Sequence, residues 1–171
     1  ATSLQAATPK ARAPRQNDKA TPLVTQTADQ LASVLQSNAD RKTKADACRE
    51  LAVIGTEKNL PAILPLLADA DLNHMARYAL ETMPGQAVDK ALRDQLGKVK
   101  GLQRVGVVGS IGVRKDAKAV KSLTALLADS DQQVAAAAAG ALGKIGNSDA
   151  LKALLAALPG KTGKLQMALA E

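Results

Sequence analysis

Apolar residues recur along this chain at helical spacing, in segments of two kinds. The first kind carries small or aliphatic residues at positions i, i+3, i+4 and i+7: Ala76, Ala79, Leu80 and Met83, then Ala138, Ala141, Leu142 and Ile145. The second kind carries larger residues at the same spacing: Leu60, Ile63, Leu64 and Leu67, then Leu151, Leu154, Leu155 and Leu158. This spacing gives each segment one apolar stripe, so the pattern predicts paired amphipathic helices.

The pairs repeat. The segment LLADAD at 66–71 recurs as LLADSD at 126–131, and LAVIG at 51–55 recurs as VGSIG at 108–112 and LGKIG at 142–146. Equivalent positions are Leu51, Leu80, Val108 and Leu142, which are 29, 28 and 34 residues apart. A period of about thirty residues is typical of a stacked array of helical hairpins.

Turn residues punctuate the predicted hairpins. A glycine follows the first helix of three pairs, and each is predicted to close its helix in the left-handed conformation: Gly55, Gly112 and Gly146. Thr56 and Asn147 then stand where they can cap the second helices, and Asp71 and Asp131 stand where first helices should start.

The composition fixes what the core can contain. Apolar residues make up 46% of the 171 residues, but there is no Phe, no Trp and a single tyrosine, Tyr78. A core of Leu, Ala, Val and Ile fills its space only if the helix backbones approach closely. The alanine-rich segment QVAAAAAGALGKIG at 133–146 is therefore interpreted as a packing surface, with Ala138 and Ala141 facing the partner helix.

The two ends differ from the array. Residues 1–26 contain Pro9, Pro14 and Pro22 among polar and basic residues, which predicts a disordered or extended basic tail. The repeat array is expected to occupy 27–171, with a helix from about Thr162 still running at the end. We expect the array to continue into further domains of the same polypeptide. The start at Ala1 leaves open a cleaved signal peptide or a trimmed chain, and with it export to the periplasm or the cell exterior.

The segment AAAAAGALGKIGNSDALKALLAAL at 135–158 resembles the HEAT-like repeat of the phycobilin-lyase type, and weaker similarity extends over 27–171. The chain also resembles HEAT segments of large exported bacterial proteins. The resemblance implies an all-α fold: a right-handed α-solenoid, armadillo-like, of about four HEAT-like hairpins plus terminal half-repeats. It implies a non-catalytic protein-interaction scaffold, with a bilin lyase or isomerase as the alternative.

Candidate residues for catalysis are few. Cys48 and His74 are the single cysteine and histidine, so no disulfide within the chain and no Cys/His metal cluster can form. The stretch GVVGSIG at 106–112 lacks the spacing of a dinucleotide fingerprint and falls in a first-helix segment. No enzymatic activity, cofactor or metal is predicted, and no apolar run approaches the roughly 20 residues of a membrane span.

The segment NHMARY at 73–78 allows two interpretations. His74, Arg77 and Tyr78 could form a binding patch, or they could tie neighbouring repeats together, with Arg77 reaching Asp69 or Asp46. The second is favoured, because long polar side chains commonly bridge helix surfaces.

Charge adds one more candidate. The net charge is +7, and residues 89–121 carry nine basic residues against three aspartates, a net of +6. Asp89 and Asp94 are interpreted as solvated charges. The predicted partner-binding residues, for a protein with an acidic surface, are Arg114, Lys115, Lys118, Lys121, Lys90 and Arg93. A merely solvated face and sequence-independent binding of a nucleic-acid backbone remain alternatives; base recognition is disfavoured because no aromatics interleave with the basic residues.

Overall fold

The computed structural model describes residues 26–157, and the secondary structure in this range is entirely helical. The α-helices are α1 (Ala28–Gln36), α2 (Arg41–Ile54), α3 (Leu60–Ile63), α4 (Asn73–Thr82), α5 (Gln86–Gln95), α6 (Gly101–Val113), α7 (Val120–Leu126), α8 (Gln132–Ile145) and α9 (Ser148–Ala157). Short 3-10 helices lie at Glu57–Asn59, Leu64–Ala68 and Ala117–Ala119.

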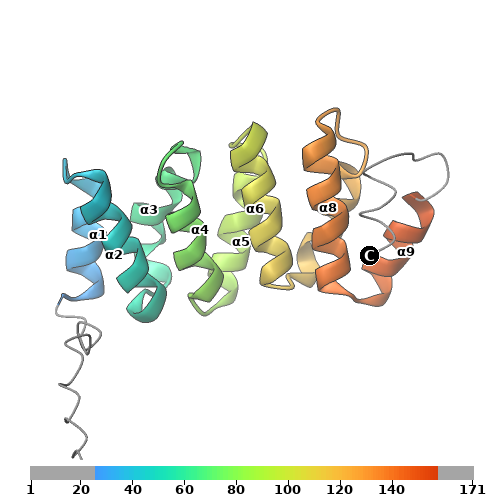
Figure 1. Ribbon diagram of the computed structural model, residues 1–171. Helices are drawn as coiled ribbons and strands as arrows, with labels where there is room; N and C mark the ends of the chain where they lie inside the picture. The colour runs from blue at the N-terminus through green and yellow to red at the C-terminus, as the bar shows by residue number, and fades with distance from the viewer. Residues whose placement is uncertain (1–25, 158–171) are drawn as a thin grey trace, which may run out of the picture.

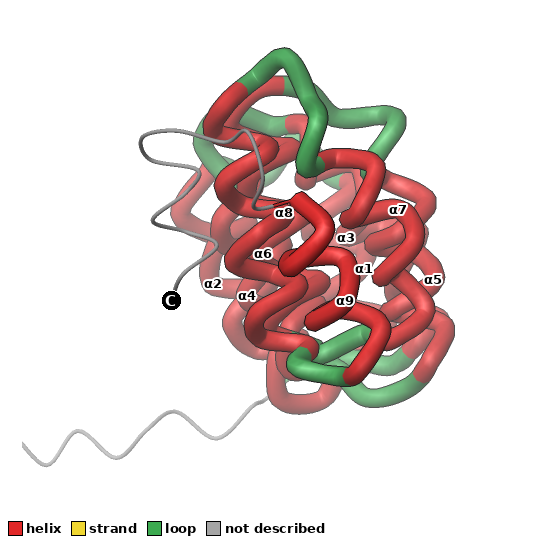
Figure 2. The backbone as a smooth tube through the Cα atoms, turned by 90° about the vertical axis from the view of Figure 1, so that its right-hand side faces the viewer, coloured by secondary structure: helices red, strands yellow, loops and turns green. Residues whose placement is uncertain are grey.

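The helices form a row of hairpins in two layers (Figures 1 and 2). Helices α2, α4, α6 and α8 make one layer and pack against one another in sequence order, while α3, α5, α7 and α9 return along the other layer. Helix α1 precedes the first hairpin as a half-repeat. The predicted all-α repeat solenoid of about four hairpins is confirmed. The predicted final half-repeat, with Thr162, Leu165, Ala168 and Leu169, lies outside the described residues, as does almost all of the predicted tail.

The core follows the repeat period read from the sequence. The four equivalent positions of the first helices are all fully buried: Leu51, Leu80, Val108 and Leu142. The core consists mainly of Leu, Ala, Val and Ile, and Tyr78 lies outside it with 48% of its surface exposed. Helix packing therefore depends on close backbone approach rather than on aromatic side chains.

Helices α6 and α8 approach each other closely. A Cβ atom built on Gly112 would lie 2.7 Å from Cα and 2.9 Å from Cβ of Ala141, closer than real side chains come. Ala138 and Ala141 are both buried. The predicted neighbour of Ala141 was wrong, because Ala141 faces α6 of the preceding hairpin and not its own partner helix. The small residues of the alanine-rich segment and the glycine opposite them let the two helices touch.

The glycine corners are only partly as predicted. Gly146 has φ of 65° and closes α8 in the left-handed conformation. Gly55 has φ of −66°, so the prediction for it was wrong, and its small size instead makes room for Met83, whose Sδ would lie 3.1 Å from an added Cβ. The prediction for Gly112 was also wrong, because α6 continues through it to Val113.

The caps show a similar mixture. Asp131 accepts a hydrogen bond from the backbone N–H of Gln133 at the start of α8, and Asn147 accepts one from Ala150 at the start of α9. Asp71 does not cap α4. Its carboxylate pairs with Arg41, and Asp69 bonds instead to the N–H of Leu72.

Two glycines on α6 provide a matched test of the close packing. We expect Gly112→Ala to lower the free energy of unfolding by about 1–3 kcal/mol, because the added methyl group overlaps Ala141. Gly109→Ala should raise it by about 0.5–1 kcal/mol, because nothing lies within 4 Å of its added Cβ and alanine favours the helix. Urea unfolding of both variants measures the difference, and equal stability would contradict the packing account.

Candidate protein-interaction surface

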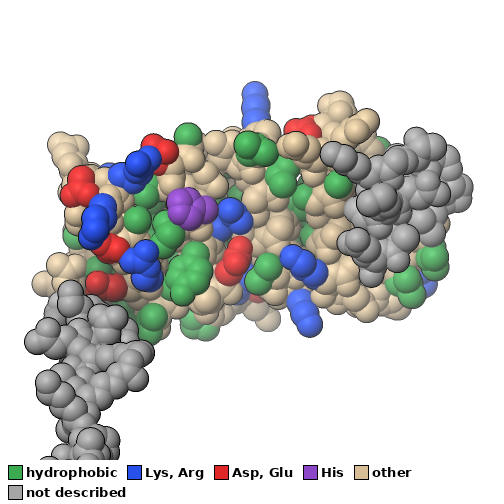
Figure 3. Space-filling view, in the orientation of Figure 1, with side chains coloured by type: hydrophobic (Ala, Val, Ile, Leu, Met, Phe, Trp, Pro, Cys, Tyr) green, Lys and Arg blue, Asp and Glu red, His purple; other side chains and the backbone are tan. Residues whose placement is uncertain are grey.

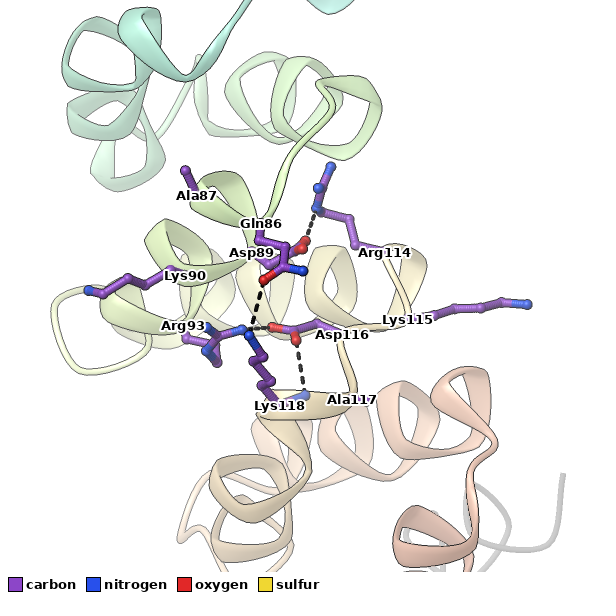
Figure 4. A pocket seen from close by; sticks show the side chains of 10 residues that line it. All are labelled: Gln86, Ala87, Asp89, Lys90, Arg93, Arg114, Lys115, Asp116, Ala117 and Lys118. Atoms are coloured by element: carbon purple, nitrogen blue, oxygen red, sulfur yellow. Dashed lines mark hydrogen bonds and ion pairs between the residues drawn. The ribbon is translucent and has the colours of Figure 1, made fainter.

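A groove of about 440 Å³ lies where α5 faces the loop after α6 (Figure 4). Its lining residues are Gln86, Ala87, Asp89, Lys90, Arg93, Arg114, Lys115, Asp116, Ala117 and Lys118. Five of the six residues predicted to bind a partner are among them. The sixth, Lys121, is exposed near the start of α7, outside the groove lining.

Arg114 is a structural residue of this region. Its side chain is only 10% exposed, and its Nε atom lies 2.5 Å from Oδ1 of Asp89 on α5. Its guanidinium also donates to the backbone carbonyl oxygens of Leu80, Glu81, Met83 and Gly85, at 2.7, 3.2, 2.7 and 3.2 Å. A helix leaves its last carbonyl oxygens without partners in its own backbone, so Arg114 caps the end of α4 while fixing α5.

Arg93 and Asp116 form a second internal pair. The Nη1 atom of Arg93 donates to Oδ2 of Asp116, whose side chain is 5% exposed, and Oδ1 of Asp116 accepts the backbone N–H of Lys118 at 3.0 Å. Asp116 is thus fully used by the fold. Like Arg114, Arg93 holds the loop after α6 against α5.

The lysines of the cluster are placed differently. Lys90, Lys115 and Lys118 are all exposed. Lys90 pairs with Asp94 at 2.6 Å, a hydrogen bond that holds the pKa of Asp94 below its usual value, and Lys118 donates to Oε1 of Gln86 at 3.1 Å. Figure 4 shows Lys90 and Lys115 pointing away from the centre of the groove on opposite sides, while Arg93 and Lys118 converge within it.

Three groups that shape the groove were missed in the sequence. Asp89, interpreted there as a solvated charge, is 21% exposed and paired with Arg114, so that interpretation was wrong; the exposed Asp94 fits it better. Asp116 and Gln86 were not singled out at all. The only available signal was the longer spacing of 34 residues between Val108 and Leu142, because each partner lies more than twenty residues away in the chain.

The segment 73–78, predicted to be either a binding patch or a tie between repeats, lies on α4 in the other layer. Figure 3 shows the face formed by α2, α4, α6 and α8, where the single histidine, His74, is exposed among charged and apolar side chains. Arg77 approaches Glu81 at 3.9 Å and lies over Gly106 of α6, while Glu81 accepts a 2.6 Å bond from the Ser110 hydroxyl. Arg77 therefore does tie repeats together.

The predicted partners of Arg77 were wrong, because Asp46 is already engaged. Its carboxylate accepts hydrogen bonds from Lys42 and Arg49 on its own helix. Both bonds lower the pKa of Asp46, and the bond from Lys42 has the larger effect. Asp69 is occupied with backbone N–H groups at the start of α4.

The single cysteine is unsuited to nucleophilic chemistry. Cys48 is fully buried on α2, and this burial raises the pKa of its thiol to about 11, because a thiolate would be desolvated there. Across 26–157 no group of three or more His, Cys, Asp or Glu side chains is placed to hold a metal ion. Within the same range no helix is long and apolar enough to cross a membrane.

The capping role of Arg114 can be tested beside its neighbour. We expect Arg114→Met to lower the free energy of unfolding by about 2–4 kcal/mol, because it leaves Asp89 and the carbonyl oxygens of α4 without their donor. Lys115→Met, the same change at an exposed site, should stay within about 0.5 kcal/mol of the unchanged protein. Thermal or urea unfolding compares them, and similar losses in both variants would contradict the role given to Arg114.

Burial of Cys48 predicts slow alkylation. At pH 8 a thiol with a pKa of about 11 holds roughly a hundredfold less thiolate than one with a pKa near 9, so iodoacetamide should react at least about a hundredfold more slowly with the folded protein than with the urea-unfolded chain. The same raised pKa stabilises the fold below about pH 9, and this contribution is lost as the pH rises towards 11. Equal alkylation rates would show that the thiol is accessible.

A family model of HEAT repeats matches residues 90–171. Among solved structures, the matches include the crystal structure of an engineered protein that is 20% identical, covers 84% of this chain and 76% of its own, and superposes with a TM-score of 0.44. No curated protein sequence matches. With the stacked hairpins of the structure and the matched repeats, this chain is a HEAT-like repeat protein.

Proposed function

We propose that the chain is a non-catalytic scaffold that binds a protein with an acidic surface through the exposed lysines around the α5–α6 groove. HEAT repeats suggest a scaffold for protein interaction, and the fold is typical of non-enzymatic repeat proteins. The contact residues proposed are Lys90, Lys115, Lys118 and Lys121. Arg93 and Arg114 hold the loop and helices that carry these lysines.

The proposal rests on the backbone conformation of Lys115. Among the described residues it is the only non-glycine with positive φ, at 53°. Its N–H donates to Gly112 O at 3.0 Å and the next N–H, of Asp116, to Ile111 O at 3.3 Å. These two bonds form the Schellman motif at the end of α6, in which the residue at this position is usually glycine.

Lysine at this position is therefore costly. A side chain in the left-handed conformation costs about 1 kcal/mol relative to glycine, and strained positions of this kind cluster at binding sites. Within the described part of the chain, Lys115 makes no side-chain hydrogen bond or ion pair that would offset the cost. The charge of Lys115 therefore serves to contact an acidic partner and does not stabilise the fold.

The rival functions predict different chemistry. A bilin lyase or isomerase would need a reactive group, and the cysteine is buried with a raised pKa. Binding to a nucleic-acid backbone would use the same lysines and show the same dependence on salt. Whether the retained molecule is a nucleic acid or a protein distinguishes nucleic-acid binding from the scaffold function. Further domains of the same polypeptide are proposed as candidates for the acidic partner.

The variant Lys115→Gly distinguishes an effect on partner binding from an effect on stability. We expect it to leave the melting temperature unchanged or higher, because it relieves the left-handed backbone, and to lose acidic proteins that the unchanged chain retains from a nuclease-treated lysate. These proteins should also elute as salt rises, since charges are screened over about 8 Å at physiological ionic strength.

Lys58→Gly, at an exposed lysine of the first hairpin, is the matched control and should keep those proteins. Retention of every partner by Lys115→Gly would reduce the cluster to a solvated face. Loss of nucleic acid alone, in lysate without nuclease, would favour the nucleic-acid alternative.

A further inference from the structure

The α5–α6 groove presents cationic donors that the fold holds in place but does not use up. Arg93 donates through Nη1 to Asp116, and Lys118 donates one bond to Gln86. The Nε and Nη2 atoms of Arg93 have no bond to the described residues and are not among the buried atoms that lack partners, and the exposed ammonium of Lys118 keeps two further N–H groups. They therefore reach the solvent in the groove.

This arrangement is suited to a carboxylate. A guanidinium binds a carboxylate through two parallel N–H groups, and an adjacent ammonium adds a third donor. Because Asp116 and Gln86 already orient the two side chains, little conformational freedom is lost when a ligand binds.

The groove also contains an acceptor. Oδ1 of Asp89 accepts from Arg114, while Oδ2 has no bond to the described residues and is not a buried unpaired atom. A peptide offers backbone N–H groups to such an oxygen. A DNA phosphate backbone offers no donor to this oxygen.

The lysines outside the centre indicate how a ligand would lie. Figure 4 shows Lys90 on one side of the groove and Lys115 on the other, with Arg93 and Lys118 between them. Positive charge is thus spread along a track instead of being gathered at one point. An extended chain with several carboxylates matches this distribution.

We propose that the α5–α6 groove binds an extended acidic peptide segment, whose carboxylates contact Arg93 and Lys118 and whose backbone N–H groups reach Asp89. The inference rests on the proposed scaffold function and gives the partner its chemistry: an unfolded acidic segment of a protein, bound along the groove from Lys90 to Lys115.

The test uses the whole chain and fluorescein-labelled octaglutamate, with binding followed by anisotropy at low salt. Octaglutamate should bind about tenfold more tightly than an oligothymidylate of the same net charge. Lys118→Gln should weaken octaglutamate about tenfold, the effect of losing one charge-assisted bond, while Lys58→Gln changes it little. Octaglutamate N-methylated at alternate amides should bind more weakly, because it lacks donors for Asp89.

Equal binding of the oligothymidylate, or equal effects of the two lysine variants, would overturn the proposal. Failure of the scaffold function can be distinguished from failure of the groove proposal. If Lys115→Gly loses lysate proteins that the unchanged chain retains, but octaglutamate does not bind the unchanged chain, the scaffold function stands and the groove is not a peptide site. If octaglutamate binds as described but no protein depends on Lys115, the groove inference stands without the wider lysine surface.

Discussion

The guanidinium of Arg114 is the interaction on which the third hairpin depends. It joins the end of α6 to the last carbonyl oxygens of α4 and to Asp89 on α5, all within one nearly buried side chain. Near the start of α6, Arg104 pairs with Asp129 at 2.9 Å beyond α7. Helix α6 is thus tied at both ends to elements of neighbouring hairpins, and the loop that follows it has a defined position. That loop carries the strained Lys115.

Arginines and lysines consequently have different roles in a region that looks uniformly basic in the sequence. Arg93, Arg104 and Arg114 each pair with an aspartate across elements, with side chains at most 28% exposed. A planar guanidinium can satisfy several acceptors at once in a partly buried site, whereas an ammonium keeps its hydration best at the surface. The net positive charge of 89–121 is therefore partly neutralised in place, and what the solvent meets comes mainly from the lysines.

The repeat architecture was predictable and the groove was not. The spacing of Leu51, Leu80, Val108 and Leu142 is local information, and each of these residues is buried as the period requires. The role of Arg114 depends on carbonyl oxygens more than thirty residues upstream, which no side-chain pattern records. Asp89 was misread for the same reason. Gly112 was predicted to be a corner because its motif matches that of Gly146, but α6 continues through it to Val113.

Arg114 supports two loops at once, and amide hydrogen exchange measures this most directly. Arg114→Lys keeps the charge but loses the planar guanidinium. The amides of Met83, Gly85 and Gln86 and those of 112–118 should then exchange faster together, because both loops lose their shared contact. The amides in the middle of α8 should be unchanged. Unaltered exchange in both loops, or faster exchange spread evenly over the array, would contradict the account.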